Sequence, residues 1–237
     1  MAQAMSRFDA LATSKLKGSQ TDMQFQSTSS VRKDDVERLL QYIPFFKQIQ
    51  QEDEQQLQTL VAFSRVSVLE AGQTFINFGS QDQWLYFLLR GELEVSYSTD
   101  NAKAVRINKI NAGEVFGEIA LLLNQPRSAD IFVSDQCRHA MIFGLDYNAF
   151  GRLMDFSLIS LATKLAFYRN VVHNLRWKLE LYRNQHPDNP LASKHRQIKL
   201  VSTPKGGEDE LQALHEQAVA LAKLLVEWNP SLGNGTY

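Results

Sequence analysis

The chain has 237 residues, a formal net charge of −1 and one cysteine, Cys137. This length can hold one well-packed core with appendages, or two small domains. Near-neutral charge argues against a global basic field that would attract nucleic acid or an acidic membrane. One cysteine excludes an intramolecular disulfide framework. Because no long apolar run or signal-peptide core is present either, the sequence predicts a cytoplasmic protein.

The first part of the chain predicts a tail followed by helices. Residues 1–30 are rich in Ser, Thr, Gln and Ala, which predicts a disordered N-terminal tail. Between residues 31 and 63, apolar residues recur at three- and four-residue spacing, as helices require. Pro44 is expected to end the first helix, and an apolar elbow at Phe45, Phe46 and Ile49 to lead into the second.

From Arg65 the apolar pattern changes to a period of two, which predicts strands. Leu93, Val95 and Tyr97, for example, alternate with polar residues. Five of the twelve glycines lie between residues 72 and 117, at turn positions between short runs. Short strands joined by glycine turns favour an antiparallel barrel or jelly roll.

The most informative stretch is residues 116–131, with the sequence F-G-E-I-A-L-L-L-N-Q-P-R-S-A-D-I. Gly117 allows a tight turn, and a short helix beginning at Glu118 would leave backbone amides free to bind an anion. Pro126 stops that helix, and Arg127 begins a new extended run. Amides and a guanidinium suit a phosphate, while a lone carboxylate suits a ribose hydroxyl. A small ligand that carries both groups close together is a cyclic nucleotide.

This stretch resembles the phosphate-binding cassette of the cyclic nucleotide-binding domain family, which includes catabolite activator protein and the regulatory subunits of the cyclic AMP-dependent kinase. The resemblance implies that Glu118 holds the ribose 2′-hydroxyl and Arg127 the cyclic phosphate, with help from backbone amides. Ser128 matches a hydroxyl site of some members, although strand alternation would turn it away from Arg127. The predicted ligand-binding residues are Phe116, Gly117, Glu118, Ile119, Ala120, Arg127, Ser128 and Ala129. Two alternatives are a solvated Glu118–Arg127 ion pair, and an intact cassette that no longer meets a nucleotide.

The resemblance also implies an α+β fold, in which an antiparallel jelly-roll barrel follows an N-terminal helical bundle. The cyclic nucleotide-binding domain would span residues 31–155. Residues 145–154 are expected to form an exit helix, with Asp146 as its cap. No metal spacing exists among the five histidines, no catalytic constellation is apparent, and no helix-turn-helix follows the barrel.

Residues 156–183 predict a long coiled-coil-like helix. Its apolar residues follow a strict 3-4 spacing from Leu158 to Tyr182, which favours a seam between two copies and hence a homodimer through residues 158–182. The alternative is a helix that packs on its own barrel. The family places a dimerising or lid-forming helix here, so the polar neighbours Tyr168, His173 and Asn174 are possible purine contacts.

Residues 184–207 predict a linker, with a basic cluster at Lys194, His195, Arg196 and Lys199. Residues 208–237 predict a C-terminal amphipathic helix and tail, with the helix at 208–228 available to a protein partner and Pro230 beyond its end. The leading hypothesis is a non-enzymatic receptor for a 3′,5′-cyclic nucleotide. Family frequency favours cyclic AMP over cyclic GMP. A ligand-free structural adaptor is the alternative, and a DNA-binding regulator is the weakest candidate.

Overall fold

The computed structural model describes residues 33–97, 105–198 and 203–233. The predicted tail at residues 1–30, Lys199 of the basic cluster and the last four residues lie outside this part. Three short helices come first: α2 (Lys33–Leu40), α3 (Pro44–Glu52) and α4 (Glu54–Ala62). Pro44 begins α3 instead of only ending the helix before it, because a proline in the first turn loses no helical hydrogen bond. The apolar residues expected in an elbow therefore belong to α3, where they are buried.

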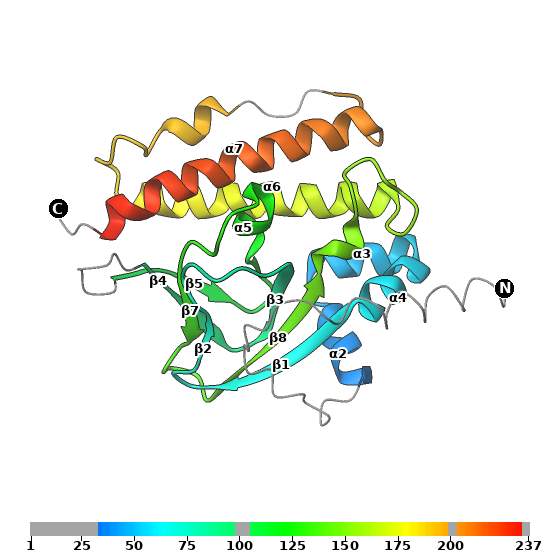
Figure 1. Ribbon diagram of the computed structural model, residues 1–237, viewed down its shortest axis with the longest axis horizontal. Helices are drawn as coiled ribbons and strands as arrows, with labels where there is room; N and C mark the ends of the chain where they lie inside the picture. The colour runs from blue at the N-terminus through cyan, green and yellow to red at the C-terminus, as the bar shows by residue number, and fades with distance from the viewer. Residues whose placement is uncertain (1–32, 98–104, 199–202, 234–237) are drawn as a thin grey trace.

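Eight strands form two antiparallel four-stranded sheets (Figure 1). One sheet has the order β1-β8-β3-β6 and the other the order β2-β7-β4-β5. The alternation of strands between two facing sheets is that of an eight-stranded jelly roll. The strands are β1 (Ser64–Glu70), β2 (Thr74–Ile76), β3 (Trp84–Arg90), β4 (Glu92–Tyr97), β5 (Val105–Asn111), β6 (Val115–Phe116), β7 (Asp130–Val133) and β8 (His139–Asp146). The predicted combination of antiparallel sheets and helices is confirmed.

Strand β3 has apolar residues on both faces because it separates two cores. Tyr86 and Leu88 point between the two sheets, toward Phe116 and Ile131. Leu85 and Phe87 point outward into a second core shared with the helices. There Phe46 packs edge-on against Phe87, with ring centroids 4.8 Å apart. Burial on both faces explains the unbroken apolar run in β3.

The exit from the sheets differs from the predicted helix at residues 145–154. Strand β8 continues to Asp146, and only one 3₁₀ turn follows, η1 (Tyr147–Phe150). Asp146 does act as a cap, since its side chain accepts a hydrogen bond from the Asn148 amide. Gly151 then adopts a φ of +60°, which breaks the helical path. The long helix α6 (Leu161–Gln185) starts ten residues after Gly151.

Helix α6 packs against the last helix, α7 (Glu208–Gly233), and the two lie side by side across one edge of the sheets (Figure 1). Between them the predicted linker contains one 3₁₀ turn, η2 (Lys194–Gln197). Helix α7 continues through Pro230, which lies in the last turn, where the missing hydrogen bond to the Val226 carbonyl interrupts little of the helix. The prediction that Pro230 lies beyond the helix was wrong.

The interpretation of the α6 stripe as a seam between two copies also requires correction. The stripe is buried within a single chain: Leu175 and Leu179 are fully covered, and Leu165 and Tyr182 nearly so. Helix α7 carries its own apolar stripe with the same spacing, and the two stripes cover each other. The alternative, a helix that packs on its own barrel, is right in that the stripe is buried within the chain, although the main partner of α6 is α7.

Candidate functional site

A small cavity of about 70 Å³ lies between the sheets and the α6–α7 hairpin. All eight predicted ligand-binding residues line it, from Phe116 to Ala129. The remaining lining residues come from the sheet, from α6 and from α7. They are Ile76, Val95, Ile107, Asn108, Ile110, Ile131, Lys178, Tyr182, Leu225 and Asn229. The cassette residues therefore meet at one place, although nine positions separate Glu118 from Arg127.

Gly117 is the residue that lets the cassette close on itself. It adopts a φ of +80° immediately before the short helix α5 (Glu118–Leu123). A Cβ at this position would lie 2.7 Å from Nη1 of Arg127 and 3.1 Å from the Tyr86 ring. Both the positive φ and the close approach of the guanidinium require glycine here.

Arg127 is buried, and its guanidinium is held by three partners. The carboxylate of Asp82 accepts from Nε, at 3.1 Å, and from Nη2. The Trp84 carbonyl accepts from Nη2 at 2.7 Å, and the Gly117 carbonyl accepts from Nη1. Asp82 and Arg127 neutralise each other, and these bonds fix the orientation of the guanidinium at the cavity wall. Sequence reasoning missed Asp82, because nothing in the loop around it marks a partner 45 residues away.

Glu118 is also buried, and a lysine from the long helix contacts it. Nζ of Lys178 lies 2.7 Å from Oε1 of Glu118, and only 2% of the Glu118 side chain is exposed. One turn earlier in α6, the Asn174 amide donates to the Val115 carbonyl at 3.0 Å. Helix α6 therefore binds the cassette at two points. The sequence does not predict Lys178, because it meets Glu118 only through tertiary packing across 60 residues.

Comparison with known proteins identifies this region. Residues 66–155 match the family model of the cyclic nucleotide-binding domain. These residues belong to the cyclic nucleotide-binding domain family.

Curated relatives match over a longer stretch of the chain. The type II regulatory subunit of cAMP-dependent protein kinase from Drosophila melanogaster is 30% identical over 119 residues, which cover 50% of this chain and 30% of the relative. A regulatory subunit of cAMP-dependent protein kinase from Blastocladiella emersonii is 28% identical over 102 residues, covering 43% and 25% of the two chains. The chain thus spans less than a third of the length of these relatives.

Solved structures with a related arrangement include the regulatory domain of Toxoplasma gondii PKA with cAMP. That match has a TM-score of 0.43 and 23% identity, and covers 60% of this chain and 57% of the other. Another is the regulatory subunit of a cAMP-independent protein kinase A from Trypanosoma cruzi bound to guanosine. Its TM-score is 0.43 at 17% identity, with 70% and 48% of the two chains covered.

Of the predicted purine contacts, the structure brings none to the cavity of the cyclic nucleotide-binding domain. The Tyr168 hydroxyl lies 2.9 Å from the Tyr147 hydroxyl and 3.2 Å from Nδ1 of His215. His173 is exposed, and the Asn174 amide is bound to Val115. Lys178 and Tyr182, one and two turns beyond Asn174, line the cavity instead. The contacting face of α6 therefore lies further along the helix than predicted.

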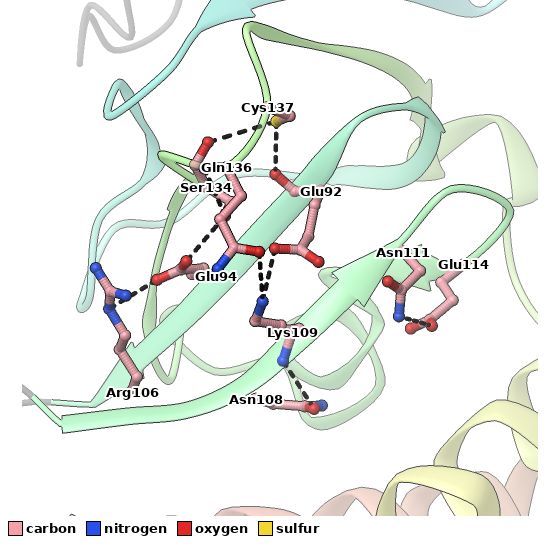
Figure 2. A network of polar contacts seen from close by, with 10 residues as sticks. All are labelled: Glu92, Glu94, Arg106, Asn108, Lys109, Asn111, Glu114, Ser134, Gln136 and Cys137. Atoms are coloured by element: carbon pink, nitrogen blue, oxygen red, sulfur yellow. Dashed lines mark hydrogen bonds and ion pairs between the residues drawn. The ribbon is translucent and has the colours of Figure 1, made fainter.

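Strand β5 forms one wall of the cavity through Ile107 and Ile110. Its polar residues join a network with β4 and the loop after β7 (Figure 2). Nε of Arg106 lies 2.7 Å from the buried Glu94 carboxylate, which also accepts from the Ser134 hydroxyl at 2.9 Å.

Nearer the other end of β5, Nζ of Lys109 lies 2.8 Å from Glu92, and this hydrogen bond lowers the pKa of Glu92 below its ordinary value. These pairs fix the strand that faces the cassette. Ser128 lines the cavity too, since β7 begins only at Asp130 and the predicted alternation does not yet apply.

A larger open groove of about 570 Å³ runs beside the cavity, between β5 and α6. Ile107, Asn108 and Lys178 line both spaces.

The part of the chain that the structure describes contains no group of three or more His, Cys, Asp and Glu side chains placed to hold a metal ion. Nor does any helix in that part have the length and hydropathy needed to cross a membrane.

Proposed function

We propose that this chain is a non-enzymatic receptor for a 3′,5′-cyclic nucleotide. The observation that carries the proposal is that Glu118 and Arg127 are both buried at one cavity of a domain matched by the family model. A carboxylate accepts a hydroxyl, and a guanidinium fork binds a phosphate. The side chains around them are mostly apolar, as in small-molecule sites that use few polar groups for orientation.

In this proposal Arg127 binds the cyclic phosphate and Glu118 binds the ribose 2′-hydroxyl. Asp82 orients the guanidinium before the ligand arrives, which lowers the entropy cost of binding. Because Lys178 contacts the Glu118 carboxylate, it must either share this carboxylate with the ribose hydroxyl or move away from Glu118 when the ligand binds. The nucleotide-binding part would span residues 31–155, and the helical hairpin beyond it would report occupancy.

Three further points belong to the same proposal. The curated relatives are named as regulatory subunits of cAMP-dependent kinases, which supports cyclic AMP over cyclic GMP. The output would be a conformational change offered to a protein partner through α7, whose apolar stripe is covered by the rest of the chain. The free thiol of Cys137 fits a reducing compartment, so we expect the chain to act in the cytoplasm.

A ligand-free adaptor is the second candidate, and two observations favour it. The cavity of about 70 Å³ is far below the roughly 300–1,000 Å³ of small-molecule sites. Both cassette side chains also have internal partners, Asp82 for Arg127 and Lys178 for Glu118. A domain that had lost its ligand would retain such pairs as structural contacts.

Isothermal titration of the full chain with cyclic AMP, cyclic GMP and linear 5′-AMP separates the two candidates. A receptor binds a cyclic nucleotide and prefers it to 5′-AMP. Arg127→Ala should weaken binding by about thirtyfold to several-thousandfold, since truncating a buried charged partner costs about 2–5 kcal/mol. The matched control is Arg38→Ala, whose side chain is 70% exposed in α2 and should leave affinity unchanged. Absence of binding at millimolar nucleotide would favour the adaptor. This must hold for the wild type and for Glu210→Gln, which removes a contact that holds α7.

A further inference from the structure

We infer that α7 is an internal occupant of the nucleotide site, and that a cyclic nucleotide enters only when α7 moves away from the cassette. This inference rests on the proposed function and concerns the regulation of the same site. It assigns a role to a helix that lies outside residues 66–155, the part matched by the family model.

The first argument is the source of the side chains that fill the site. Leu225 and Asn229 of α7, one turn apart, line the cavity together with Tyr182 of α6. The Asn229 side-chain oxygen accepts from the Tyr182 hydroxyl at 3.4 Å. Trp228, fully buried beside them, packs edge-on against the Tyr182 ring with centroids 5.7 Å apart. With α7 in place the space left is about 70 Å³, which is too small for a nucleotide.

The second argument is that α7 is an addition to the domain and not a part of its sheets. It pairs with no strand, and it contacts α5, the helix of the cassette, directly. Figure 1 shows α7 lying across the top of α5 and α6, on the side away from β1 and β8. Movement of α7 therefore leaves both sheets and their strand pairing intact.

The third argument is that polar contacts far from the cavity add to the apolar packing that holds α7 in place. At the first turn of α7, Glu210 accepts from Nε and Nη2 of Arg169, at 2.8 and 2.7 Å. The Gly206 amide donates to the same carboxylate at 2.6 Å. Neither Glu210 nor Arg169 lines the cavity. The docking of α7 can thus be weakened without any change at the nucleotide site.

The docking of α7 lowers the apparent affinity for the nucleotide. If the binding-competent state is a small fraction of the molecules, the apparent dissociation constant rises by the inverse of that fraction. A change that loosens α7 enlarges the fraction and tightens nucleotide binding. Ligand binding in turn uncovers the stripe that contains Leu221 and Leu225, and this is the surface that a protein partner of the receptor would meet.

The test is a cyclic AMP titration of the full-length wild type, Glu210→Gln, Arg169→Gln and the double variant. Each single variant should bind cyclic AMP about fivefold or more tightly than the wild type. The double variant should gain little beyond the singles, because both remove the same contact. Arg38→Ala, which breaks the exposed Asp35–Arg38 pair, is the control and should bind as the wild type does.

Equal affinities in the wild type and the Glu210 and Arg169 variants would overturn the role of α7 and leave the receptor proposal standing. Absence of binding in all of them would overturn both. Hydrogen exchange on the wild type gives a measurement that needs no variant. Saturating cyclic AMP should speed amide exchange across α7 while the cassette becomes protected, and slower exchange in α7 would contradict the inference.

Discussion

Lys178→Met offers a direct test of the contact between the long helix and the cassette. Nζ of Lys178 and Oε1 of Glu118 are 2.7 Å apart, and 10% and 2% of their side chains are exposed. At an effective dielectric constant of about 20, two unit charges at this distance attract by about 6 kcal/mol. Desolvation offsets most of this attraction, so the net contribution of the pair is small.

The single substitution behaves differently from loss of the whole pair. Lys178→Met leaves the Glu118 carboxylate buried without its cation, which should cost about 3–5 kcal/mol of unfolding free energy. A chain of this size loses roughly 2–4 °C of melting temperature per kcal/mol, so Tm should fall by about 10 °C. In the double variant with Glu118→Gln no buried charge remains, and much of the stability should return.

Thermal and urea unfolding of both singles and the double variant complete a double-mutant cycle. The control is Lys109→Met, because Lys109 and Glu92 form an ion pair of 2.8 Å whose side chains are 48% and 25% exposed. That substitution should cost at most about 1 kcal/mol. If Lys178→Met cost no more than Lys109→Met, or if the two singles were additive, the buried pair would not exist as described.

Three other perturbations test the surroundings of the site. Gly117→Ala should destabilise the chain by about 1–3 kcal/mol and weaken nucleotide binding, because φ is +80° and Cβ would meet Arg127; wild-type melting and affinity would contradict this. Lys164→Met should cost about 1–3 kcal/mol, because the Lys164 ammonium donates to the carbonyls of Arg152, Leu153 and Asp155, and a melting temperature equal to that of the wild type would count against it. Burial lowers the pKa of His215 below its ordinary value of 6.5, although Glu216 opposes the shift, so the unfolded state binds the proton more tightly. Unfolding free energy should therefore fall as pH drops below about 6.5, and that part of the pH dependence should vanish in His215→Gln.

The sequence shows which cassette residues lie together because this information is local. Gly117, Glu118 and Arg127 stand at fixed spacing in one short segment, and the structure gathers all eight predicted residues at one cavity. The sequence does not predict Asp82 or Lys178, because each meets the cassette only through tertiary packing. Asp82 lies 45 residues before Arg127, and Lys178 lies 60 residues after Glu118. A pattern within one segment carries no signal for such pairs.

The error over the α6 stripe has a different cause. Apolar spacing shows that a helix face is buried but does not reveal which surface covers it. Two successive helices with matching stripes can cover each other as a hairpin, even when a linker as long as the one between α6 and α7 joins them. Leu175 and Leu179 in one helix and Leu221 and Leu225 in the other carry this signal, and both pairs are buried. The two stripes taken together favour a hairpin over a homodimer.

The most direct test of the account compares cyclic AMP with its 2′-deoxy form on the wild type and on Glu118→Gln. In the wild type the ribose 2′-hydroxyl donates a hydrogen bond to the Glu118 carboxylate, and such a bond contributes about 1.5–3 kcal/mol. The ribo form should therefore bind about 10- to 150-fold more tightly than the deoxy form. In Glu118→Gln that preference should fall to about 2- to 10-fold, because the neutral amide oxygen still accepts from the hydroxyl but contributes only about 0.5–1.5 kcal/mol. Any effect of the substitution on folding or on α7 changes both affinities alike and cancels in their ratio. The same ribo-to-deoxy ratio in both proteins would contradict the assignment of Glu118 as the ribose ligand.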